Sequence, residues 1–489
     1  MALDRHDFRT AAIAIAAVTT ASCASLDEEL LTAQLPDVPA TWSADDGLGG
    51  ELTGDWVAAF NDPAVLDIIR EALENNNDLQ AAAANLDAAR AGARIARADL
   101  FPQIGANFDA SRNAIVTDPT TAAQAGGSAG AASSRLFINN FRLGGNVRWE
   151  IDLWGRLIDT TNAAYKDAQA AYADLAGAEL SIAARTVQAW FALIEARQQR
   201  ELAERDVTAR ESNLRVTERR YERGVASSLD VRLSRSALGS SQANLALRQR
   251  LEKEASRSLE VLLGRYPAAE LEAAENLPTL PLLDGAGAPG DILARRPDLV
   301  AAESRMLAAG LRARAARKQL LPQLTLSSQA GTSGPEFADL TDPQRLAGNI
   351  AGGLVQPLFQ GGRLLANSKS ARANAEAALF NYVQTVLAAY EEAENAIAAE
   401  QLLAAREAAL QLAYEEAAAA EDLTERRYSS GAATIFNLLD AQTRRISAES
   451  EFIQAKQQRV SNRVQLYLAI GGDFLTEERL TALAAETGE

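Results

Sequence analysis

The side chains that usually carry catalysis or bind metals are scarce in this chain of 489 residues. It contains one histidine, His6, and one cysteine, Cys23, so neither a Cys-His nucleophile nor a His/Cys metal cage can be built. Carboxylates are plentiful, with 65 acidic residues, yet no acidic pair is singled out by a pocket-forming context. A soluble hydrolase using paired carboxylates is therefore a weak hypothesis. We predict no catalytic residue, no metal site and no cofactor.

The chemistry that Cys23 can offer is acylation of its thiol. Arg5 and Arg9 precede the apolar run AAIAIAAV, which is too short to span a membrane and is followed by small residues. This pattern predicts a secretory signal over residues 1–22. Ala-Ser-Cys resembles the bacterial lipobox, with Thr20 at the position where leucine is usual. Cys23 is thus predicted to be the lipidated first residue of the mature chain, and an incidental thiol within the signal is the alternative.

Charge and composition limit the class of partner. The net charge is −17, which argues against nucleic acid, because phosphates demand a basic face. An acidic chain suits a solvated surface or a pathway that attracts cations. Aromatic residues make up only 6% of the chain, and alanine is abundant, as in long, closely packed helices. We expect such helices rather than a large globular core.

The elements that position these residues occur twice along the chain. Glu-Arg-Arg-Tyr, with glycine three residues after the tyrosine, begins at Glu218 and again at Glu425, an offset of 207. Upstream, Phe101-Pro102-Gln103 matches Leu321-Pro322-Gln323 at an offset of 220, which places thirteen extra residues in the first copy, around a small-residue loop. The predicted organisation is a signal (1–22), a lipid-anchored N-terminal segment (23–63), a first repeat (64–275), a linker rich in proline and glycine (276–291), a second repeat (292–472) and a C-terminal tail (473–489).

Each repeat is predicted to contain a helix, two strands, a very long helix and a returning helix. The first helix covers about 64–100 in one copy and 297–320 in the other. No proline occurs from 154 to 266, and residues 156–223 as one helix would reach roughly 100 Å. The glycine-containing turn then leads into a last helix that ends at Gly264 or Gly471.

Alternation along the strands indicates where this part of the chain lies. The segment FRLGGNVRWEIDL, residues 141–153, places apolar side chains at odd positions and polar ones at even positions. A soluble, half-buried strand alternates in the same way, but a strand of this length also fits an outer membrane. Four such strands cannot close a barrel alone, so we expect the chain to oligomerise. The residues predicted to face lipid are Phe141, Leu143, Val147, Trp149 and Ile151.

Together, several motifs resemble one family over nearly the whole mature chain: the outer-membrane efflux proteins of the TolC-like superfamily, in their lipoprotein branch. The segments that carry the resemblance are NDPAVLDIIREALENNNDL, DLWGR, ARRPDLVAAE, QPLFQGGR and the two Tyr-x-x-Gly turns followed by LDV and NLLDAQ. The resemblance implies a mainly α protein with a membrane β part. It also implies a homotrimer in which an α-helical tunnel continues into a shared 12-stranded β-barrel.

The same resemblance implies a function and partners. The trimer would be the outer-membrane exit duct of a tripartite efflux pump, extending into the periplasm and docking on a periplasmic adaptor and an inner-membrane transporter. A type I protein-secretion duct of the same fold is one alternative. A coiled-coil lipoprotein scaffold is another, and it would explain the helices and Cys23 but not the amphipathic strands.

The resemblance also carries gate residues onto this chain. Tyr221, Gly224 and Gly431 mark the two helix-turn tips, where glycine can adopt the left-handed conformation that such a helix end needs. A purely structural turn is the alternative. Carried over by position, Phe436 gives an apolar ring, Asp440 an acidic ring, and Tyr428 and Asp230 a tie between the two helix pairs. The sequence departs from the family at Ala433, where an arginine is found, and at Asn437, where an acid is found, so we expect fewer polar links.

Overall fold

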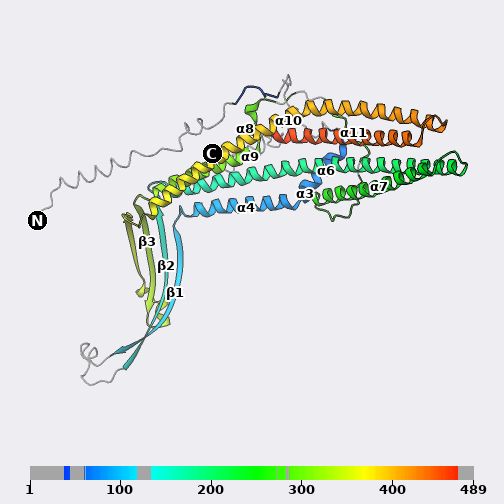
Figure 1. Ribbon diagram of the computed structural model, residues 1–489. Coiled ribbons are helices and arrows are strands. Elements are labelled where there is room, and N and C mark those ends of the chain that lie inside the picture. The colour runs from blue at the N-terminus through cyan, green and yellow to red at the C-terminus, as the bar shows by residue number, and fades with distance from the viewer. Residues whose placement is uncertain are drawn as a thin grey trace, which may run out of the picture. The chain divides into compact units, whose positions relative to one another are not determined.

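The computed structural model describes residues 38–44, 60, 62–117, 134–272, 274–281, 285 and 287–471 (Figure 1). The predicted signal, Cys23, the predicted loop after β1 and the predicted tail lie outside these residues. The main helices are α3 (Pro63–Asn75), α4 (Asn77–Ala98), α6 (Arg156–Glu222), α7 (Ser228–Leu262), α8 (Ile292–Arg295), α9 (Pro297–Lys318), α10 (Arg363–Ser429) and α11 (Ile435–Ala469). The strands are β1 (Gln103–Thr117), β2 (Ser134–Ile151), β3 (Gln323–Gly334) and β4 (Ala347–Val355), and the short 3₁₀ turns are η2 (Pro289–Asp291), η3 (Phe337–Thr341) and η4 (Pro343–Arg345).

Two compact units make up the described chain, and each contains matching parts of both repeats. The first unit holds residues 88–168 and 304–379. The second holds the described residues up to 87, then 169–303 and 380–471. Each unit therefore combines corresponding segments of the two repeats. None of the helices in the described ranges is both long enough and apolar enough to cross a bilayer.

The first unit contains a four-stranded antiparallel sheet with strand order β1-β2-β3-β4 (Figure 1). In its register, Ile104 lies opposite Val147, and Trp149 lies opposite Leu326. Directly opposed residues project to the same side of a sheet, so the apolar sets of all four strands share one face. The polar set, such as Arg148 opposite Gln103, shares the other face.

Two strand boundaries differ from the prediction. β2 begins at Ser134, before the predicted start at Phe141, because the β1–β2 ladder continues to the pair Thr117–Ser134. The sequence also predicts a glycine-rich fourth strand over 348–359, but β4 ends at Val355. Pro357 explains the earlier end, since proline has no N–H to donate to a ladder.

The long helices confirm the helix prediction. α6 and α10 contain 67 residues each, and the helices that return from them, α7 and α11, contain 35 each. The single helix predicted over 64–100 was wrong, because the chain forms two helices separated by Asn76. Asn76 has extended backbone angles, and its side-chain oxygen accepts the N–H groups of Asp78 and Leu79, so it ends α3 and starts α4.

The second unit is built around an apolar core in which the linker takes part. Phe191 and Ile194 of α6 lie at the centre of this core, with 1% and 0% of their surface exposed. Leu277 and Leu280, from the predicted linker, are buried in the same cluster. The backbone oxygen of Pro281 also accepts hydrogen bonds from two arginines of α11. The described residues at the start of the linker, up to Pro281, are therefore packed onto the helices.

Candidate gate at the helix-turn tips

The two tips have the same backbone construction. In the first, Gly224 has φ +74°, and the N–H groups of Val225 and Ala226 donate to the carbonyl of Arg220. In the second, Gly431 has φ +82°, and two successive N–H groups donate in the same way to the carbonyl of Arg427. A positive φ at this position closes a helix end with little strain only for glycine. The left-handed conformation expected of both glycines is thus present.

A capping box starts each returning helix. At α7 the side chain of Ser227 accepts from the N–H of Asp230, and the carboxylate of Asp230 accepts from the N–H of Ser227. At α11 the same exchange joins Thr434 and Asn437. These boxes satisfy backbone donors that a helix start leaves without partners. Each tip is therefore a tight turn held by local bonds.

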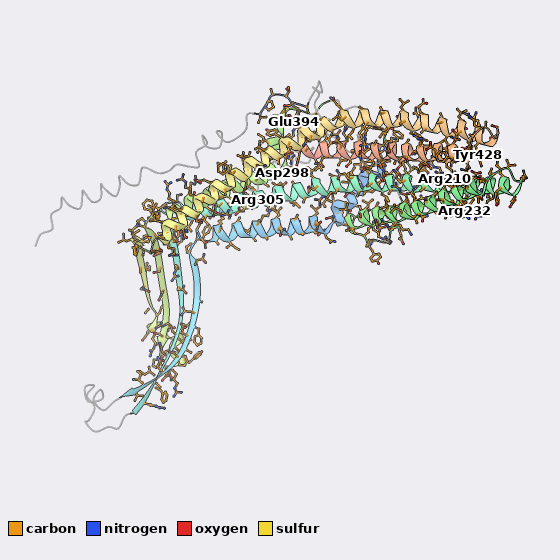
Figure 2. All side chains as sticks on the ribbon, viewed as in Figure 1. Arg210, Arg232, Asp298, Arg305, Glu394 and Tyr428 are labelled. Atoms are coloured by element: carbon orange, nitrogen blue, oxygen red, sulfur yellow. The ribbon has the colours of Figure 1, made fainter. Side chains whose placement is uncertain are left out.

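Tyr428 connects the two tips. Its side chain is buried, and its hydroxyl lies 3.2 Å from Oγ1 of Thr217 on α6. The guanidinium of Arg220, also on α6, lies over the Tyr428 ring at 4.4 Å from its centroid. Arg220 Nη2 donates to the backbone oxygens of Tyr428 and Ser429, each at 3.1 Å. The labelled Tyr428 marks this position near the end of α10 (Figure 2). We call these contacts of Thr217 and Arg220 with Tyr428 the tip clasp.

Asp230 takes no part in that clasp. Its carboxylate accepts from the backbone N–H and the hydroxyl of Ser227, at 2.7 and 2.9 Å, within the cap of its own helix. A Tyr428–Asp230 tie, which the resemblance implied, is therefore absent from the hydrogen bonds of the described chain. Arg220 supplies the link between the repeats instead. Sequence reasoning missed Arg220, although the repeated Glu-Arg-Arg-Tyr contained it.

Phe436 and Asp440 lie on the first turns of α11. They are four residues apart and so project from the same side of the helix. The Phe436 side chain is 66% exposed. Oδ2 of Asp440 accepts from Nε of Arg444 at 2.9 Å, an ion pair on one helix that the sequence analysis did not anticipate. Because an exposed pair of this kind is weak, Arg444 lowers the negative field of Asp440 without removing it.

A polar seam continues from the tip between α6 and α11. Nη2 of Arg210, the residue labelled in Figure 2, donates to Oγ1 of Thr443. Asn213 donates to Gln442 at 2.9 Å. Further along, Arg445 of α11 is bonded to Glu421 and Glu449. Burial alone would lower the pKa of Arg445, but the bonds and charges of these two glutamates outweigh burial and raise it. Beside the hydrogen bonds between α6 and α11, Arg445 thus adds one ion pair to α10 and one within α11.

The sheet presents the other predicted site residues. Phe141, Leu143, Val147, Trp149 and Ile151 alternate along β2 and so share its apolar face. The indole N–H of Trp149 donates to the backbone oxygen of Leu100 at 2.9 Å, and the ring of Phe141 meets Phe337 edge-on at 5.9 Å. Trp149 is two residues from the end of β2, or about 7 Å along the strand. Within the described residues, no cluster of His, Cys, Asp and Glu is arranged to hold a metal.

Long paired helices, tight tips and a sheet with one apolar face define a channel-tunnel of the outer membrane. The chain belongs to the family described as "Outer membrane efflux protein", whose sequence profile matches residues 68–265 and 288–472. It is the outer-membrane exit duct of an efflux pump, and its relatives are efflux channel proteins rather than enzymes.

Relatives and solved structures agree on this class. The chain is 31% identical to the toluene efflux pump outer membrane protein TtgC of Pseudomonas putida over 463 residues, covering 91% of each chain. It is 30% identical to the pyoverdine export outer membrane protein OpmQ of Pseudomonas aeruginosa, covering 87% of this chain and 88% of that one. The outer-membrane channel OprN superposes with a TM-score of 0.80 at 28% identity, over 90% of this chain and 98% of the other. The open state of the Neisseria gonorrhoeae MtrE channel gives 0.74 at 26%, over 90% and 98%.

Proposed function

We propose that the protein is a passive homotrimeric duct in which three sheets close one 12-stranded barrel. The observation that carries this proposal is the four-stranded sheet, whose outer strands β1 and β4 each pair on one side only among the described residues. An open sheet edge is not tolerated in lipid, because its N–H and C=O groups have no partners there. Three copies of four strands give an even number of strands, as bacterial barrels have.

The proposal places the apolar sheet face against lipid and the polar face toward the lumen. Cys23, if acylated, would add a lipid anchor at the mature N-terminus. The tips then lie at the periplasmic end of the tunnel, where a periplasmic adaptor and an inner-membrane transporter would dock. The names of these relatives mention toluene and pyoverdine, which supports small molecules as the exported class.

One experiment separates this duct from an anchored coiled-coil scaffold. In the Cys23→Ser variant, acyl labelling with palmitate should be lost, yet the protein should still need detergent for extraction, because the barrel holds it in the membrane. A scaffold held only by its lipid would be released into buffer by the same change. Light scattering of the detergent-extracted protein, corrected for bound detergent, should give the mass of three chains. A monomeric mass would overturn the trimeric barrel.

The gate is the second part of the proposal. Phe436 blocks passage by size and dewetting, and Asp440, repeated around a threefold axis, sets a preference for cations and allows divalent block. Carboxylates held close together attract cations, divalent ones most. Arg444 bonds Asp440 in each chain and tempers this field.

Planar bilayer recordings test the gate. Wild-type trimers should show a small, cation-selective conductance that divalent ions reduce. Phe436→Ala should enlarge the conductance, and Asp440→Ala should remove the divalent block while trimers stay intact. Arg444→Ala should strengthen the divalent block, because it leaves the carboxylate unpaired. Full divalent sensitivity in Asp440→Ala would show that the acidic ring lies elsewhere, with Asp230 the next residue to test.

A further inference from the structure

Every side chain of the tip clasp is encoded twice. Residues 217–221 read Thr-Glu-Arg-Arg-Tyr, and residues 424–428 read Thr-Glu-Arg-Arg-Tyr again. The clasp that forms uses the threonine and arginine of the first copy and the tyrosine of the second. In the described part of the chain, no hydrogen bond or ring contact joins the complementary set, Thr424 and Arg427 with Tyr221.

The members of the complementary set are accessible. Tyr221 is 50% exposed, whereas Tyr428 is 7% exposed. Arg427 is exposed, and its side chain makes no ion pair with a described residue. Thr424 Oγ1 donates to the backbone oxygen of Ala420, which is the counterpart of the bond from Thr217 to Asn213. The first copy makes this same bond while it engages Tyr428, so Thr424 is already oriented for a clasp.

The helix faces around this set are open in the same way. Within the chain, a face of α6 packs on α11, and Gln442 at that contact is 3% exposed. The residue that matches Gln442 on α7 is Arg235, whose side chain is 66% exposed. On α10, the counterpart of buried Asp206 is Ala413, which is exposed. Within the chain, α6 packs on α11. The corresponding faces of α10 and α7 are exposed, so the chain presents both sides of a second interface of the same kind.

We propose that a second copy of this chain completes the set, so that Arg427 and Thr424 of one protomer clasp Tyr221 of the partner subunit. The inference rests on the homotrimer of the proposed function and deepens it. Three clasps within protomers and three between them would alternate around the tips. Assembly then requires the turn in both repeats. Within a chain the first repeat supplies the threonine and arginine and the second supplies the tyrosine, and between chains these roles are exchanged.

Cross-linking between two distinguishable chains tests the proposal. Chains carrying Tyr221→Cys and Arg427→Cys separately, with different affinity tags, are co-expressed and treated with a short bis-maleimide. We expect a covalent heterodimer that contains both tags. The double variant in one chain should give covalent trimers on a denaturing gel, with loss of most of the monomer band. Each single variant expressed alone controls for reaction through Cys23, the chain's only native cysteine.

Arg426 provides a matched control, because it is adjacent in sequence but paired with Asp422 on its own helix at 2.5 Å. Arg426→Cys with Tyr221→Cys should give far less heterodimer. Equal cross-linking at 426 and 427, or trimers that do not cross-link at 427, would overturn the clasp and leave the trimeric duct standing. Monomers in detergent for the unsubstituted protein would instead overturn the proposed trimer.

A second measurement applies if the cysteine variants do not assemble. Arg427→Lys keeps the charge but loses the planar group that stacks on a ring and donates two bonds. On heating in detergent, Arg427→Lys trimers should dissociate at a lower temperature than Arg426→Lys trimers. Identical dissociation temperatures would contradict the proposal.

Discussion

Tyr221 and Tyr428 occupy the same position in two turns with the same backbone hydrogen bonds, yet one is exposed and the other buried. The difference comes from what stands beside each turn. Tyr428 contacts Thr217 and Arg220 at the end of α6, whereas no hydrogen bond or ring contact joins the side chain of Tyr221 to another described residue. The turn is thus a local structure that forms wherever its sequence occurs, whereas the clasp depends on which helix lies next to it.

Strand positions show what the two repeats share. Val147 and Leu354 match at an offset of 207, and both lie on the apolar face. If that face contacts lipid, Val147→Arg and Leu354→Arg should each cost about 2–4 kcal/mol near the bilayer midplane and less toward its surfaces. Yields of folded, heat-resistant trimer would measure the loss. Substitution of the polar-face neighbour Arg148 by alanine is the control, and an equal loss there would refute the face assignment.

Substitutions of Arg220 and Arg427 should distinguish the tip clasp within one chain from the proposed clasp between chains. Arg220→Ala removes a ring contact and two bonds to backbone carbonyls, which together contribute about 2–3 kcal/mol. Amides at the end of α10 should then exchange hydrogen faster, even in monomers. Arg427→Ala should accelerate exchange around Tyr221 in trimers only. If Arg427→Ala also accelerates exchange around Tyr221 in monomers, Arg427 does not contact Tyr221 of a partner subunit.

The strand ends offer a smaller comparison. Trp149 and Gln356 match at an offset of 207, and their side chains donate to the matching carbonyls of Leu100 and Leu320, each at 2.9 Å. Trp149→Phe and Gln356→Leu should each cost about 1 kcal/mol, the usual net value of one hydrogen bond. Thermal dissociation of trimers would detect both losses. A loss confined to Trp149 would mean that ring packing rather than the shared bond matters.

Asp230 should give the smallest effect. Its match in the second repeat is Asn437, which forms the same capping box through an amide. Asp230→Asn should therefore change stability by less than about 0.5 kcal/mol, since either side chain can accept the N–H of the cap. Tip exchange and bilayer conductance should be close to wild type. An increase in hydrogen exchange at the tips as large as that of Arg220→Ala would show that Asp230 takes part in the link between the two tips.

Much of this architecture could be predicted because its causes are local. The long stretch without proline indicated one continuous helix at α6. The second stretch without proline contains α10, which has the same length. Alternation along 141–153 predicted a strand with one apolar face, because side chains on a strand alternate regardless of its partners. The glycine turns were predictable for the same reason, since positive φ is a property of one residue.

Tertiary structure alone decided which side chains meet between different helices. The Ser-x-x-Asp spacing from Ser227 is that of a capping box and could have indicated the bond of Asp230 within its own cap. Nothing in the sequence indicated that Arg220 would engage Tyr428, because that contact depends on how α6 lies against α10. The pairing of Asp440 with Arg444 follows from helix spacing and could have been predicted. Identical residues at Tyr221 and Tyr428 have different surroundings because burial is set by neighbouring helices rather than by the residue itself. The sequence therefore determined the turns, the long helices and the face of each strand, and only the packing of the two repeats decided which copy of the clasp is completed within the chain.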